Sequence, residues 1–152
     1  MKTTFLTIGI AIISVTSVLA TGFSERKLDS AKKFAERTEK LIAFVFYQAY
    51  DENSIDRNHT ANVDAANNGA KRAIPRADAL EVEIFKGDKE TDKIPACVSK
   101  TGKTPRVIIT DAKCENVIAS YEGVPNRETL KAVEEKVTAA RNLMKAAVEE
   151  KK

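Results

Sequence analysis

The chain has 152 residues, of which 43% are hydrophobic and 31% charged. This balance is typical of a globular protein, and the length suits one domain with a single core. The formal net charge is +3, from 25 basic and 22 acidic residues, and the two signs are interspersed. Without a basic block, nucleic-acid binding is not expected. The single histidine excludes a His-rich metal site, and we expect neither a metal nor another cofactor.

The first 20 residues have the pattern of an export signal. Lys2 supplies a positive charge, residues 5–19 form an uncharged and mostly apolar run, and residues 18–20 offer a cleavage site. The run is short for a membrane span, which needs about 20 residues. We therefore expect a signal peptide over 1–20 and a mature domain over 21–152, exported to a bacterial periplasm or the extracellular space. Membrane association is expected only if the segment is retained as an anchor.

The elements predicted next are two helices and two strands. Residues 24–40 favour an amphipathic helix. Residues 41–47, LIAFVFY, are apolar without alternation, which indicates a strand buried on both faces at the centre of a sheet. Residues 55–73 have helical spacing, although Gly69 could mark an early end. Residues 79–85 alternate between apolar and acidic side chains and predict a half-exposed strand.

The second half of the chain begins with a short turn or helical piece at 94–98. A hairpin is expected after it, with strands at 107–110 and 116–121 around a polar turn. A long amphipathic helix follows, with Asn126 as its N-cap and a C-terminal end that runs past the sheet beyond residue 140. Its inward face is predicted to comprise Leu130, Val133 and Val137.

The ordered set of Thr104-Pro105, strand, polar turn, strand, Gly123 and closing helix resembles the C-terminal half of the thioredoxin fold. The resemblance implies a thioredoxin-like α/β three-layer sandwich with a four-stranded mixed sheet, flanking helices and a long C-terminal helix. The implied strand order is 79–85, 41–47, 105–110, 116–121. It also implies a cis peptide bond between Thr104 and Pro105, the bond type in which cis forms concentrate.

In that family the strand matching 41–47 leads into a Cys-x-x-Cys motif. Here Tyr50 takes the aromatic position before the motif, and Asp51 and Ser54 stand in place of the two cysteines. Thiol–disulfide exchange needs a reactive thiolate and a second sulfur, which a carboxylate and a hydroxyl do not supply. The sequence therefore predicts a redox-inactive motif, and Asp51 is better suited to capping a helix.

The chain has two cysteines, Cys97 and Cys114. The resemblance places them at opposite ends of the sheet, so a disulfide between them is disfavoured by distance. It implies that Cys97 is a small buried side chain beneath the proline loop. It implies that Cys114 is exposed in the turn and able to form intermolecular disulfides.

The leading functional hypothesis is an exported binding or scaffolding module for a protein or peptide partner. The family's groove binds an extended peptide through free backbone groups beside the proline, although the groove could equally be inherited without a ligand. The residues implied for it are Tyr50, Asp51, Thr104, Pro105 and Gly123. Two alternatives stay open: an atypical thiol-redox protein using Cys97, and a membrane-tethered assembly subunit that keeps its N-terminal segment.

Overall fold

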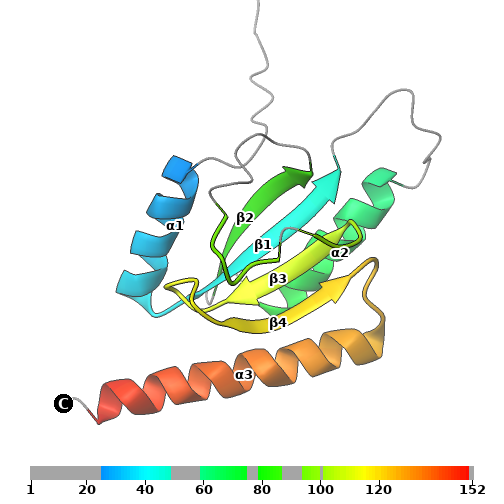
Figure 1. The fold of residues 1–152 in the computed structure, drawn as a ribbon. Coiled ribbons are helices and arrows are strands. Elements are labelled where there is room, and N and C mark those ends of the chain that lie inside the picture. The colour runs from blue at the N-terminus through cyan, green and yellow to red at the C-terminus, as the bar shows by residue number, and fades with distance from the viewer. Residues whose placement is uncertain (1–24, 49–58, 75–78, 87–93, 100, 151–152) are drawn as a thin grey trace, which may run out of the picture.

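The computed structural model describes residues 25–48, 59–74, 79–86, 94–99 and 101–150. The predicted signal peptide and the stretch from Tyr50 to Ser54 lie outside these ranges. The predicted helices and strands of the described ranges are all found, with ends shifted by a few residues (Figure 1). In chain order the elements are α1 (Glu25–Thr38), β1 (Leu41–Gln48), α2 (His59–Ala73), β2 (Ala79–Lys86), β3 (Arg106–Thr110), β4 (Val117–Glu122) and α3 (Arg127–Glu149).

The strands pair in the order β2-β1-β3-β4, which is the order predicted. β1 pairs with β2 in parallel, whereas β1 with β3 and β3 with β4 are antiparallel. The register between β3 and β4 shifts at Ile109 and Thr110, next to the turn that joins the two strands. Every residue from Leu41 to Phe46 is at most 4% exposed, so β1 is the doubly buried central strand that its unbroken apolar run predicts.

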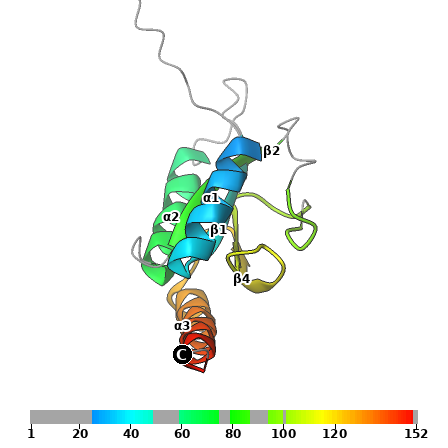
Figure 2. The ribbon, with the colours of Figure 1, turned by 90° about the vertical axis from the view of Figure 1, so that its left-hand side faces the viewer.

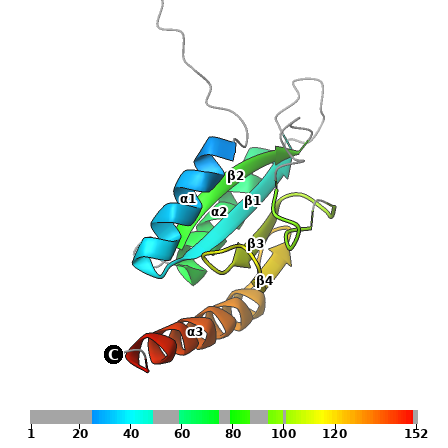
Figure 3. The ribbon, with the colours of Figure 1, turned by 60° about the vertical axis from the view of Figure 1, so that its left-hand side comes forward.

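Two hydrophobic clusters form the core, one on each face of the sheet. Alternate residues of β1 point to opposite faces, because successive side chains of a strand do so. Leu41, Ala43 and Val45 pack with residues of α2 and α3. Ile42, Phe44 and Phe46 pack with residues of α1 and with the 94–98 segment. α1 therefore covers one face of the sheet, and α2 and α3 cover the other (Figure 3).

The structure corrects the predicted fold class, which was a thioredoxin-like three-layer sandwich on a four-stranded mixed sheet. A three-stranded antiparallel sheet, β1-β3-β4, carries the long C-terminal helix, and β2 is attached to it only by parallel pairing with β1. On the α1 side, no helix of the described residues covers β4, where Ser120 and Glu122 are exposed. Helix layers thus enclose β1 on both faces but leave β4 covered on one.

Gly69 lies inside α2, so the early helix end considered from the sequence is wrong. The reason for a glycine is close packing rather than termination. A Cβ at this position would lie 2.6 Å from the Pro125 side chain and 3.1 Å from the Tyr121 hydroxyl. With glycine at position 69, α2 therefore approaches the start of α3 and the end of β4 more closely than any other residue at that position would allow.

α3 begins with the predicted cap, and its C-terminal end runs past the sheet (Figure 1). Figure 2 views this helix from its C-terminal end. The Thr129 N–H donates to Asn126 Oδ1 at 2.7 Å, and Val133 and Val137 are buried in the core, as predicted. Leu143, near the C-terminal end, is 73% exposed, which also agrees with the prediction. Among the described helices, none combines the length and apolar character that a membrane span requires.

Candidate functional site

The candidate site is the corner where β3 begins and β4 ends. Because the two strands are antiparallel, Pro105 and Gly123, which flank them, are brought together. The Gly123 N–H donates to the Pro105 carbonyl oxygen at 2.7 Å. The peptide bond between Thr104 and Pro105 is cis, so that prediction is confirmed. We call Thr104, Pro105 and Gly123 the Pro105–Gly123 corner.

The corner is open to its surroundings at Gly123. This residue has φ = +71°, in the left-handed region that glycine adopts most easily. A Cβ placed on it would meet no heavy atom within 4 Å beyond its chain neighbours. Thr104 is half-buried, and Val124 is 56% exposed. Within the described residues, the accessible parts of the corner are therefore Thr104 and Gly123, because Pro105 itself is buried.

A buried arginine lies directly behind the corner. Arg106 is only 4% exposed, and its guanidinium carbon lies 4.2 Å from the centre of the Phe46 ring, a cation–π geometry. Its Nη2 donates to the Ser99 carbonyl oxygen at 2.8 Å. Its Nε and Nη1 are buried and have no hydrogen-bond partner among the described residues. Burial lowers the pKa of Arg106, and the opposite charge of Glu122 acts in the other direction.

Gly102 packs against this arginine and against its cross-strand neighbour. Arg106 and Glu122 are paired in the register of β3 and β4. A Cβ on Gly102 would clash with Arg106 Nη1 and lie 2.6 Å from Glu122 Oε1. Gly102 also has φ = +138°, which L side chains rarely adopt. The loop before the proline is therefore held against both side chains, and the buried Arg106 forms the inner wall of the corner.

The structure unites three of the five residues predicted for the groove. Thr104, Pro105 and Gly123 form the corner, whereas Tyr50 and Asp51 lie outside the described residues. Sequence reasoning missed Arg106 as part of the site. The sequence did hold a signal for it, because Arg106 immediately precedes the four β-branched residues 107–110 of a predicted strand. Burial of an unpaired charge at such a position is costly.

The two cysteines are neighbours, so the prediction that they lie at opposite ends of the sheet is wrong. The Cys97 thiol donates to the Cys114 carbonyl oxygen at 2.8 Å. Cys114 is 5% exposed, so its predicted exposure is also wrong. The cause is the path of the chain before β3. Segment 94–99 reaches the turn after β3 through Cys97 and reaches the start of β3 through the contact of Ser99 with Arg106.

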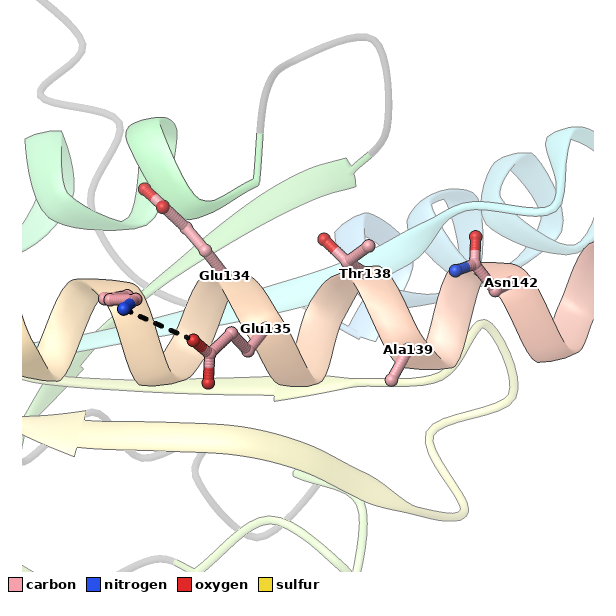
Figure 4. Close-up of a pocket in the computed structure, with 6 residues that line it drawn as sticks. Glu134, Glu135, Thr138, Ala139 and Asn142 are labelled. Atoms are coloured by element: carbon pink, nitrogen blue, oxygen red, sulfur yellow. Dashed lines mark ion pairs between the residues drawn. The ribbon is translucent and has the colours of Figure 1, made fainter.

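The surface hollows found elsewhere do not form a second site. The hollow drawn in Figure 4 is lined by residues of α3 alone, including the exposed ion pair of Lys131 with Glu135 at 3.9 Å. A second hollow is lined by α1 alone, around Phe34. Side chains of a single helix enclose no ligand. In the described ranges, no group of three or more His, Cys, Asp or Glu side chains is placed to hold a metal ion.

Comparison with known proteins identifies no family. The chain matches no protein-family model, and no curated protein is similar to it at a significant level. The resemblance to thioredoxin noted from the sequence gains no support from these comparisons.

Proposed function

We propose that the protein is a binding module that receives an extended segment of a protein or peptide partner at the Pro105–Gly123 corner. The observation that carries the proposal is the combination of a fixed backbone and an open space. The 2.7 Å hydrogen bond from Gly123 to Pro105 holds the corner, while among the described residues a Cβ added to Gly123 would meet no heavy atom within 4 Å beyond its chain neighbours. A rigid and accessible backbone lowers the entropic cost of ordering a ligand on it.

The recognition mode that suits this position is addition of a strand to the sheet. β4 lies at one edge of the sheet and ends at the corner. An edge strand presents backbone groups that an extended peptide can pair with. Val117, the first residue of β4, is 45% exposed, and Val124, two residues after the strand ends, is 56% exposed. They favour a partner segment that carries apolar side chains at matching positions.

We further propose that the protein is exported, as the pattern of residues 1–20 predicts. An extracellular or periplasmic location makes exported proteins the class of partner to search. The contacts at the corner are a backbone hydrogen bond from Gly123 to Pro105 and, behind it, the Arg106 guanidinium held by the Ser99 carbonyl oxygen. Binding is the activity that its backbone geometry supports.

The test is selection of peptides from a random displayed library on the immobilised mature protein. Selected peptides are then titrated into isotope-labelled protein, and NMR shift changes are mapped. We expect the largest changes at Thr104, Gly123 and β4. A Thr104→Arg variant should weaken binding about tenfold or more, equivalent to about 1.4 kcal/mol, because the new side chain fills the corner.

The matched control is Thr138→Arg, which makes the same change at an exposed position of α3. Both variants should keep the circular dichroism spectrum and unfolding midpoint of the parent protein. Equal affinity of the two variants for the selected peptides, or shift changes confined to another surface, would refute the corner as the binding site.

A further inference from the structure

We propose that Cys97 and Cys114 are a reversible thiol–disulfide pair, oxidised by a small-molecule disulfide such as oxidised glutathione. Both residues are free thiols in the structure. Their contact, from Cys97 Sγ to the Cys114 carbonyl oxygen, is 2.8 Å long. With ordinary bond lengths this contact places the two Cα atoms at most about 8 Å apart, and less wherever the path between them bends. Disulfides span Cα distances of about 4.4–6.8 Å.

The surroundings hold both thiols in place for the reaction. Ile94 and Val98, on either side of Cys97, are 5% and 1% exposed and anchor their segment in the core. The Val98 N–H donates to the Pro95 carbonyl oxygen at 2.9 Å. Rotation of the Cys97 side chain away from the Cys114 carbonyl is therefore one movement that must occur before the two sulfurs can meet.

The turn that carries Cys114 is equally well fixed. The Asp111 carboxylate accepts the backbone N–H groups of Glu115 and Asn116 at 2.9 and 3.0 Å. The Thr110 hydroxyl donates to Cys114 Sγ at 3.6 Å. Cys114 itself has φ = +57°, a conformation that glycine or asparagine adopts at lower cost. A cysteine is thus an unfavourable choice for the turn alone, and its sulfur is directed into the core beside Cys97.

The two thiols have unequal access to solvent, which assigns their roles. Cys97 is partly exposed and Cys114 is buried. The Cys97 thiolate attacks one sulfur of the small disulfide, forming a mixed disulfide and releasing one small thiol. The Cys114 thiolate then attacks the Cys97 sulfur and releases the second small thiol. The protein loses two electrons and two protons, and the small disulfide gains them as two thiols.

The electrostatic environment makes this exchange slow at neutral pH. Burial raises the pKa of both thiols, and Asp111 raises them further, whereas Lys32 of α1 lowers them. A raised pKa reduces the thiolate fraction that reacts. The pair therefore suits a disulfide that is set by the environment and persists, rather than a rapid catalyst that reduces other proteins.

The test incubates reduced full-length mature protein in buffers of graded glutathione redox ratio, followed by quenching with a maleimide. Intact mass and peptide mapping identify the product. We expect a monomer that has lost two hydrogen atoms, incorporates no maleimide and yields a peptide linking Cys97 with Cys114. Return to two reactive thiols on addition of dithiothreitol is the expected sign of reversibility.

The single variants separate the two steps. In Cys114→Ser the reaction should stop at a mixed disulfide between glutathione and Cys97. In Cys97→Ser the buried Cys114 should react much more slowly. Because either variant could fold poorly, the linked peptide from the parent protein decides the question. Glutathione retained on both cysteines, a disulfide-linked dimer, or two free thiols at the most oxidising ratio would each overturn the proposal.

Discussion

Replacement of Gly69 by alanine tests whether close packing of α2 explains this glycine. In an exposed helix interior the change stabilises by about 1 kcal/mol, since alanine has the higher helix propensity. Here the new methyl group would lie 2.6 Å from Pro125 Cγ and 3.3 Å from Leu130 Cδ2. The proline ring cannot rotate away, so α2 or the start of α3 must move. Overpacking of this kind costs about 1–3 kcal/mol.

The movement also threatens a buried hydrogen bond. The Tyr121 hydroxyl donates to the Ala66 carbonyl oxygen at 2.5 Å, and weakening such a bond costs about 1 kcal/mol. The weakened hydrogen bond and the gain in helix propensity nearly cancel, which leaves Gly69→Ala destabilised by about 1–3 kcal/mol. Urea unfolding measures the free energy of unfolding of Gly69→Ala and of a control variant, Asn68→Ala. Asn68 is exposed in the same helix, and its replacement by alanine should stabilise the protein by about 0.5 kcal/mol. A Gly69→Ala variant as stable as the parent would refute the packing argument.

Three further outcomes are expected. Val133→Ala should destabilise the fold by about 2 kcal/mol in urea unfolding, because this side chain is 4% exposed in the core. Asn126→Ala should cost about 1 kcal/mol through loss of the α3 cap, whereas Asn142→Ala, at an exposed position of the same helix, should cost nothing. Burial raises the pKa of Cys97 and Cys114, so the stability that their protonated forms contribute is present below the ordinary thiol pKa. Stability in reducing buffer should therefore fall above about pH 8.5 more steeply than in the double alanine variant; parallel pH profiles would contradict this.

The helices and strands could be predicted from the periodicity of apolar residues. The placement of helix layers on both faces of the sheet could be predicted from the central strand. The unbroken apolar run of β1 has only one stable setting, between two helix layers, and the structure places it there. The hairpin and α3 follow from local turn, cap and helix signals near residues 111–126. The exposure of one face of β4 does not follow from such local signals. Whether that face is covered depends on the position of segments that are distant in the sequence.

The candidate site was predictable where it depends on the ends of neighbouring strands and hidden where it depends on irregular segments. Pro105 and Gly123 meet because an antiparallel hairpin requires it. The position of Cys97 is set by segment 94–99, which is irregular and has no periodic signal. Its path is determined by the burial of Ile94 and Val98. These tertiary contacts, rather than local propensity, bring the two cysteines together.

The proposed corner and the proposed cysteine pair share that same segment. Cys97 contacts Cys114, and two residues later the Ser99 carbonyl holds the guanidinium of Arg106 behind the corner. A covalent bond at Cys97 restrains Ser99, and with it the side chain that forms the inner wall of the corner. Any effect of oxidation on peptide affinity then has a reciprocal effect of the peptide on the thiol–disulfide equilibrium, because linkage between two sites is symmetric. Peptide affinity must therefore be measured separately on the fully reduced and the fully oxidised protein, since a mixture of the two forms reports neither.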